Sequence, residues 1–140
     1  MISEKTLSII EKIPERKYIM KKVKQTLIPY SKEVKFAFLF GSYATGNADI
    51  WSDVDIGIYF TKNLSEDKRD EIRFKVNDSL EPIETQIGYL DNEDISPEIF
   101  IAAGEGIPIV MNDRDTYYDE WMKNIHQLEE MKLIGIIKED

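Results

Sequence analysis

The chain lacks cysteine, a basic charge balance and long apolar runs, and each absence removes a class of protein. Without cysteine among its 140 residues, it has no disulfides and no thiolate metal ligands. No apolar run approaches the roughly 20 residues that cross a membrane. The N-terminus, Met-Ile-Ser-Glu-Lys, lacks the basic start and apolar block of a signal peptide. We therefore expect a cytoplasmic protein with no membrane partner.

Positive charge is scarce, since the formal net charge is −9 at pH 7. A protein that holds nucleic acid electrostatically needs a basic surface to displace counterions from the phosphates, so we expect no nucleic-acid partner. An acidic chain can still bind a nucleotide through a metal ion, because the ion supplies the positive charge locally. The acidity mainly favours solubility, and it also suits a basic protein partner.

The apolar pattern predicts one mixed domain. With 42% apolar and 32% charged residues, the chain has the composition of a single globular domain. Strands alternate with helices, which favours the α/β (α+β) class, with one small mixed β-sheet flanked by helices. We treat 1–140 as one domain that contains N-terminal helices in 3–28, a central core in 34–111 and a C-terminal helix in 113–132.

Apolar spacing and turn residues predict where the elements lie. Strands are expected at 34–40, 54–60, 83–90 and 107–111. Helices are expected at 3–13, 15–28, 65–80, 97–103 and 113–132, with a short helical turn at 42–45. Ser65 and Ser96 are the expected N-caps of the two helices that they precede.

Two carboxylates, Asp53 and Asp55, stand two residues apart at the start of the second expected strand. Residues i and i+2 of a strand point to the same face, and two like charges side by side are unfavourable unless something neutralises them. Oxygen ligands without a nearby His or Cys favour a hard divalent cation, Mg²⁺ or Mn²⁺. The plainer alternative is that one Asp caps a turn and the other is solvated.

The first expected strand ends at Gly41 and continues through Ser42 into a helical turn. Such a turn presents backbone N–H groups and a hydroxyl to an anion, and glycine lets the backbone approach that anion closely. Gly46 allows the loop to fold back. Each half of the pattern is weak alone, but together they predict a phosphate cradle beside a metal-binding pair.

The two halves also carry a family resemblance. Gly41-Ser42-x-Ala44-x-Gly46, followed by Ser52-Asp53-x-Asp55-Ile56, resembles the signature of the nucleotidyltransferase superfamily related to DNA polymerase beta, and most of all its minimal branch, the MNT proteins. The resemblance implies that fold, Mg²⁺ or Mn²⁺ as cofactor, and ATP or another nucleoside triphosphate as substrate. It further implies two sets of residues: nucleotide-binding Gly41, Ser42 and Ser52, and catalytic, metal-binding Asp53 and Asp55.

The family's third carboxylate lies on the strand after the intervening helix, and here the chain departs from the pattern. That strand reads Pro-Ile-Glu-Thr-Gln-Ile-Gly-Tyr-Leu, without the usual Asp. Glu84 lies on a suitable face and is the predicted third acid, as a catalytic residue and metal ligand. Gln86 shares that face. If the strand register puts Gln86 at the catalytic position, an amide replaces the acid, and an amide cannot act as a base and is a poor metal ligand.

The resemblance leaves three functions open. The first is a Mg-dependent transferase that moves AMP from ATP to an acceptor hydroxyl, with a tyrosine of a HEPN-type toxin as the expected acceptor. MNT proteins resemble the antitoxin half of such pairs. The second is a catalytically weak or inactive module that neutralises its partner by contact. The third is a small-molecule transferase of the aminoglycoside-modifying kind, working as a homo-oligomer.

Overall fold

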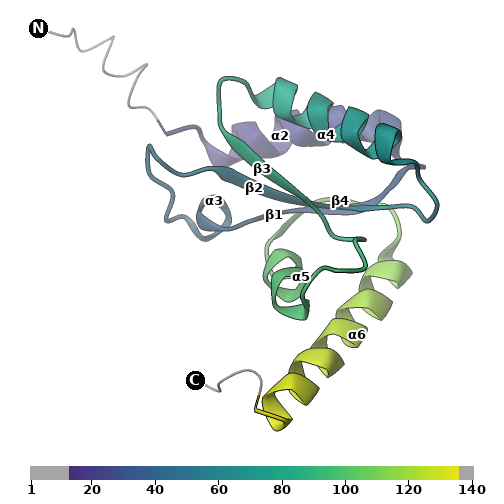
Figure 1. Ribbon diagram of the computed structural model, residues 1–140. Helices are drawn as coiled ribbons and strands as arrows, with labels where there is room; N and C mark the ends of the chain where they lie inside the picture. The colour runs from purple at the N-terminus through teal and green to yellow at the C-terminus, as the bar shows by residue number, and fades with distance from the viewer. Residues whose placement is uncertain (1–12, 136–140) are drawn as a thin grey trace, which may run out of the picture.

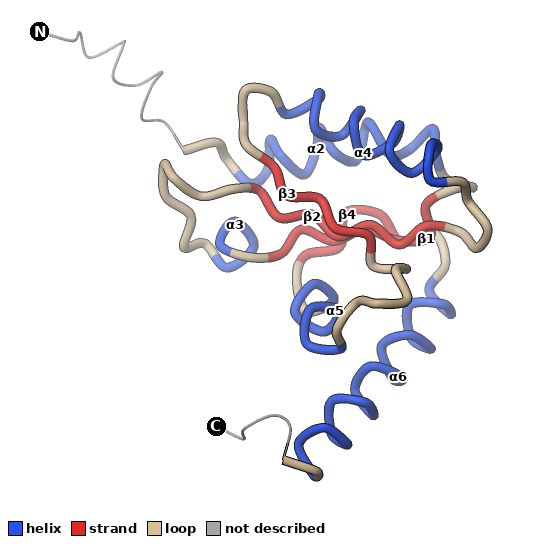
Figure 2. The backbone as a smooth tube through the Cα atoms, viewed as in Figure 1, coloured by secondary structure: helices blue, strands red, loops and turns tan. Residues whose placement is uncertain are grey.

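The computed structural model describes residues 13–135, which form a central sheet with helices on both faces (Figures 1 and 2). The strands are β1 (Val34–Phe40), β2 (Val54–Phe60), β3 (Thr85–Tyr89) and β4 (Ile107–Met111). The helices are α2 (Arg16–Leu27), α3 (Ser42–Thr45), α4 (Glu66–Leu80), α5 (Pro97–Gly104) and α6 (Arg114–Leu133), and a 3-10 turn, η1 (Ile28–Tyr30), follows α2. The mixed fold class predicted from the sequence is confirmed.

The strands lie in the order β3-β2-β1-β4. β1 runs antiparallel to both β2 and β4, whereas β2 and β3 are parallel. The parallel pair needs a crossover connection, which α4 provides. Across 13–135, none of the helices is long and apolar enough to cross a membrane.

The two faces of the sheet carry different cores. Helices α2 and α4 cover one face, and α5 and α6 cover the other (Figure 1). The layer under α2 and α4 is mainly aliphatic, with Leu39, Ile56, Ile58 and Ile72 among its buried residues. The layer under α5 and α6 is aromatic, and Phe36, Phe38 and Phe100 are buried there. Because β1 is covered on both faces, it reads as the continuous apolar run seen in the sequence.

Local chemistry places most element boundaries where the sequence predicts them. Strands β1, β2 and β4 have the expected bounds, and Ser65 and Ser96 accept the capping hydrogen bonds at 3.2 and 3.3 Å. β3 begins two residues later than expected, because the N–H of Ile83 donates to the carbonyl of Leu80 at 2.8 Å and closes a turn. The helix expected over 3–13 lies outside the described residues except for its last position.

A buried ion pair ties α4 to the loop after β3, and it supports a prediction about stability. Arg69 pairs with Asp91, and their side chains are 19% and 8% exposed. Asp91 also accepts the N–H of Phe60 at 3.1 Å. We expect Arg69→Met to lower the free energy of unfolding by about 3 kcal/mol, because it leaves the Asp91 carboxylate buried without its cation. Urea denaturation followed by circular dichroism measures this loss.

The matched control lies four residues further along the same helix. Arg73 pairs with Asp70 at 3.7 Å, and both side chains are about half exposed. We expect Arg73→Met to change the free energy of unfolding by less than about 1 kcal/mol, because solvent screens such a pair. Equal losses for the two variants would contradict the structural role of the Arg69–Asp91 pair.

Candidate functional site

The structure brings the glycine–serine turn and the second aspartate together at one end of the sheet. Because β1 and β2 are antiparallel, the end of β1 meets the start of β2, and Phe40 pairs with Asp55. Gly41, which follows Phe40, has φ 73° and ψ −155°. A Cβ atom on Gly41 would overlap Asp55 Oδ2 and lie 3.1 Å from Asp55 Cγ. The backbone of this turn therefore lies directly against the carboxylate.

The two aspartates, hereafter the acid pair, are half-buried and close enough to repel each other. Burial raises the pKa of the Asp55 carboxyl, and the charge of Asp53 raises it further. Burial also raises the pKa of Tyr43, with the charges of Asp49 and Asp53 adding to the effect. Within 13–135, neither member of the acid pair forms an ion pair with Lys or Arg. A divalent cation would supply the charge compensation that this oxygen-rich site lacks.

A hydrogen-bonded turn precedes the acid pair and uses Ser52. The backbone N–H of Ser52 donates to the carbonyl of Asp49 at 3.1 Å, and the Ser52 hydroxyl accepts the N–H of Asp49 at 2.9 Å. The Asp49 carboxylate accepts the N–H of Trp51 at 2.8 Å. The Ser52 hydroxyl thus holds the loop, and its nucleotide-binding role stays a prediction. Asp49 organises this turn, a role that its Asx-turn spacing signals.

Trp51 is presented to solvent by the same turn. Its side chain is 85% exposed, and that of the preceding Ile50 is 49% exposed. Both residues lie in the loop between α3 and β2, at the end of the sheet that carries the acid pair (Figure 1). An exposed tryptophan next to a site can contact a bound molecule through its large apolar face.

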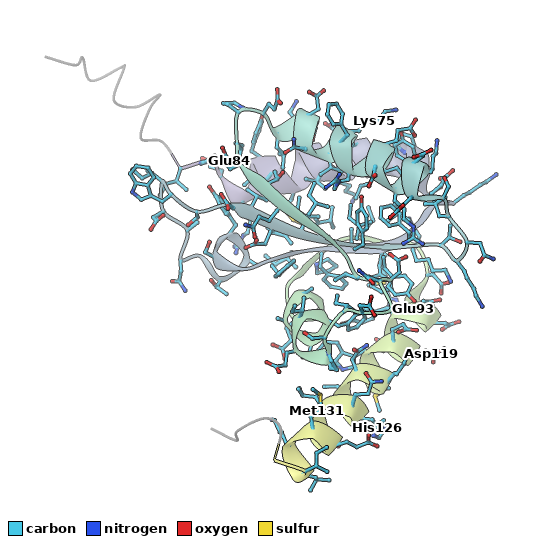
Figure 3. All side chains as sticks on the ribbon, in the orientation of Figure 1. Lys75, Glu84, Glu93, Asp119, His126 and Met131 are labelled. Atoms are coloured by element: carbon cyan, nitrogen blue, oxygen red, sulfur yellow. The ribbon has the colours of Figure 1, made fainter. Side chains whose placement is uncertain are left out.

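Glu84 does not join the acid pair in a three-carboxylate cluster. In the parallel β2–β3 register, Val54 pairs with Thr85 and Asp55 pairs with Gln86. Glu84 lies one residue before β3, where its carbonyl accepts the N–H of Val54 at 2.9 Å. Figure 3 labels its side chain at the start of β3. Between residues 13 and 135, no group of three or more Asp, Glu, His or Cys side chains is arranged to hold a metal ion.

A cleft of about 1000 Å³ lies elsewhere, at the carboxyl ends of β2 and β3. Its lining includes Tyr59, Asp91, Glu93 and Asp119, and Figure 3 shows the last two far along the sheet from Glu84. Burial, with the nearby charge of Glu120, raises the pKa of Tyr59 to about 12, so its phenol stays protonated. The sequence does not predict this cleft, because loops and α6 form it through long-range packing.

The comparisons with known proteins agree with the geometry at the acid pair. Residues 21–115, more than half of the chain, match the family Polymerase beta, Nucleotidyltransferase. The chain belongs to this nucleotidyltransferase family. The resemblance predicted from the Gly-Ser and Asp-x-Asp motifs is thereby confirmed. Among curated proteins, none matches this nucleotidyltransferase domain.

Solved structures confirm the fold of this nucleotidyltransferase. A toxin–antitoxin complex with AMP-PNP matches with a TM-score of 0.65 and 19% identity, over 81% of this chain and 90% of the other. A mutant MntA–HepT toxin–antitoxin complex matches with a TM-score of 0.65 and 17% identity, over the same shares. A complex of MNT antitoxin with the tri-AMPylated HEPN toxin of Shewanella oneidensis matches with a TM-score of 0.61 and 15% identity, over 84% and 90%.

Proposed function

We propose that this chain transfers AMP from ATP to a hydroxyl group of a protein acceptor, in a reaction that depends on Mg²⁺ or Mn²⁺. The observation that carries the proposal is the contact between the Gly41 backbone and the Asp55 carboxylate. This contact supports the proposal, because a reaction on a metal-bound triphosphate requires an anion-binding turn next to the metal-binding carboxylates. A cytoplasmic location, expected from the sequence, is part of the same proposal.

The residues present fit a hard divalent cation. The acid pair offers only oxygen ligands, and its charges repel each other without a paired cation in the described part of the chain. The chemistry that Mg²⁺ or Mn²⁺ supplies when bound is stabilisation of the charge on the transferred phosphate and the leaving pyrophosphate.

The chain's own residues bind the triphosphate, orient the reacting groups and accept the acceptor's proton. Gly41 and Ser42 hold the triphosphate, because the first N–H groups of a helix have no acceptor within it. The acid pair would hold the cation, whose positive charge would draw the negatively charged α-phosphate to the carboxylates for attack by an oriented hydroxyl. Glu84 is the chain's candidate base for the acceptor proton, and it is exposed at the position before β3.

The structural neighbours guide the choice of acceptor. They are toxin–antitoxin complexes, one with AMP-PNP and one in which a HEPN toxin carries AMP groups. We therefore propose ATP as the donor and a tyrosine of a HEPN-family partner as the acceptor. A tyrosine suits this chemistry, because its phenol loses a proton more readily than an aliphatic hydroxyl does.

The test is transfer of label from α-labelled ATP in the presence of Mg²⁺. The full chain is co-expressed with the HEPN-family protein encoded beside it, or incubated with cell lysate when no such neighbour exists. We expect label on a protein acceptor with the native chain and none with the double variant Asp53→Ala, Asp55→Ala. A native chain that binds AMP-PNP but labels nothing would contradict the transferase proposal.

One observation favours a second function, a binding module that acts by contact alone. Gln86, an amide, is the β3 residue paired with Asp55, and an amide cannot accept the acceptor's proton. The discriminating measurement is toxin neutralisation by the Asp53→Ala, Asp55→Ala variant. Full neutralisation without transfer supports the binding module, whereas loss of neutralisation supports catalysis.

A further inference from the structure

The sheet register places a neutral side chain next to the second aspartate. Asp55 pairs with Gln86, one step after the pairing of Val54 with Thr85. Paired residues of neighbouring strands point to the same face of a sheet. Thr85 points toward α4, where its hydroxyl donates to Asn77 Oδ1, and Val54 is buried in the same layer. Asp55 and Gln86 therefore both point to the opposite face.

Glu84 occupies a different place along the same edge. The hydrogen bond from the N–H of Val54 to the carbonyl of Glu84 places it two residues before Gln86, alongside Asp53. Among residues 13–135, Glu84 and the acid pair do not form a group of three carboxylates that could hold a metal ion. The β3 side chain in register with Asp55 is thus an amide, and the Glu84 carboxylate lies two residues earlier on the chain, level with Asp53.

A carboxylate and an amide at this place differ in charge more than in shape. Glu and Gln have the same length, and both offer an oxygen to a cation, but only Glu adds a negative charge. The affinity of an oxygen site for a divalent cation rises with the number of charged ligands. A site with two carboxylates and one amide therefore binds the free cation more weakly than one with three carboxylates.

We propose that Gln86 is a positioning residue of this centre, whose neutral amide keeps the acid pair from binding a divalent cation until a nucleotide brings further oxygens. The inference rests on the proposed function, since it assumes that the acid pair is the metal site. The phosphates of a nucleotide add the missing negative charge, so cation and nucleotide binding become coupled. Such coupling is reciprocal, and each ligand strengthens the binding of the other.

The test measures Mn²⁺ affinity by electron paramagnetic resonance of the free ion, with the full chain, with and without AMP-PNP. We expect Gln86→Glu to bind Mn²⁺ alone about 10-fold more tightly than the native chain, because it adds one charged ligand. AMP-PNP should strengthen Mn²⁺ binding strongly in the native chain and less in Gln86→Glu. Gln86→Asp, with a shorter side chain, is the second variant, and thermal melts check that both fold.

The matched control is Glu93→Gln, which removes a carboxylate of the same length at the other end of the sheet, in the cleft after β3. We expect its Mn²⁺ affinity to stay within about 2-fold of the native value, because a surface charge screened by solvent acts over roughly 10 Å. The inference is overturned if neither Gln86 variant binds Mn²⁺ more tightly, or if Glu93→Gln weakens binding as much as Asp55→Asn.

Failure of the proposed function gives a different result. In that case Asp55→Asn would leave Mn²⁺ binding unchanged in the presence of AMP-PNP, because the acid pair would not be the metal site. The three variants Gln86→Glu, Glu93→Gln and Asp55→Asn thus separate the two ideas in one set of titrations.

Discussion

Asp55→Asn is expected to reduce AMP transfer by on the order of 10³-fold, because a carboxylate that holds a catalytic cation contributes several kcal/mol to the transition state. Asn has nearly the same shape, so the substitution removes charge without opening a cavity. Asp55 is half-buried against the Gly41 backbone, and the variant side chain fits the same space. Initial rates with labelled ATP at saturating Mg²⁺ measure the loss.

The control for this prediction is Asp119→Asn on α6. Asp119 is exposed and lines the cleft at the other end of the sheet. It should leave the rate of transfer unchanged within about 2-fold, since a surface charge screened by solvent acts over roughly 10 Å. Equal losses in the two variants would show that net charge, and not the acid pair, governs the rate.

Asp55→Asn, although it slows AMP transfer, is not expected to destabilise the fold. Burial and then the charge of Asp53 raise the pKa of Asp55 in the folded chain, so its ionised form is favoured more in the unfolded chain. At pH 7 the charged side chain therefore destabilises the fold. We expect Asp55→Asn to melt at the same or a higher temperature at pH 7, with the difference vanishing below the ordinary aspartate pKa of about 4. A lower melting temperature at pH 7 would contradict this.

Short-range chemistry made much of the site predictable from the sequence. The apolar run of β1 stops at Gly41, and the run of β2 starts directly after Asp53, so both strands have the expected bounds. Their connection, residues 41–53, contains only the one-turn helix α3 and no long crossover helix, which favours an antiparallel pairing. The nearness of the glycine–serine turn to the acid pair follows from that pairing.

The sequence leaves open whether Glu84 or Gln86 lies opposite Asp55, and the pairing of β3 with β2 decides this. The alternation of β3 puts Glu84 and Gln86 on one face, and a register shift of two residues determines which of them pairs with Asp55. That register depends on how α4 packs and on the turn that ends with Ile83, and neither can be read from the strand itself. The motif likewise predicts a nucleotide-binding role for the Ser52 hydroxyl. In the structure this hydroxyl donates a hydrogen bond to the Asp49 carboxylate within the turn, and the motif does not predict that contact.

Gly41→Ala is the second substitution with a large expected effect, and it acts through the backbone. Gly41 has φ 73° and ψ −155°, a region that is essentially restricted to glycine and costs other residues about 1–3 kcal/mol. The added methyl would overlap Asp55 Oδ2. We expect transfer to fall about 10²-fold or more, because a displacement of about 1 Å at a reacting centre has an effect of that size. Initial rates and Mn²⁺ titrations measure it.

Gly46→Ala is the matched control, since it also changes a glycine with positive φ in the same loop. Gly46 has φ 82° and ψ 11°, and a Cβ atom there would meet nothing within 4 Å. Both variants should lose stability, Gly46→Ala by about 1–2 kcal/mol for its left-handed conformation. Only Gly41→Ala should lose transfer and weaken Mn²⁺ binding in the presence of AMP-PNP. If Gly41→Ala keeps the native rate, the Asp55 carboxylate can move without consequence, and the contact that places the turn against the acid pair has no catalytic role.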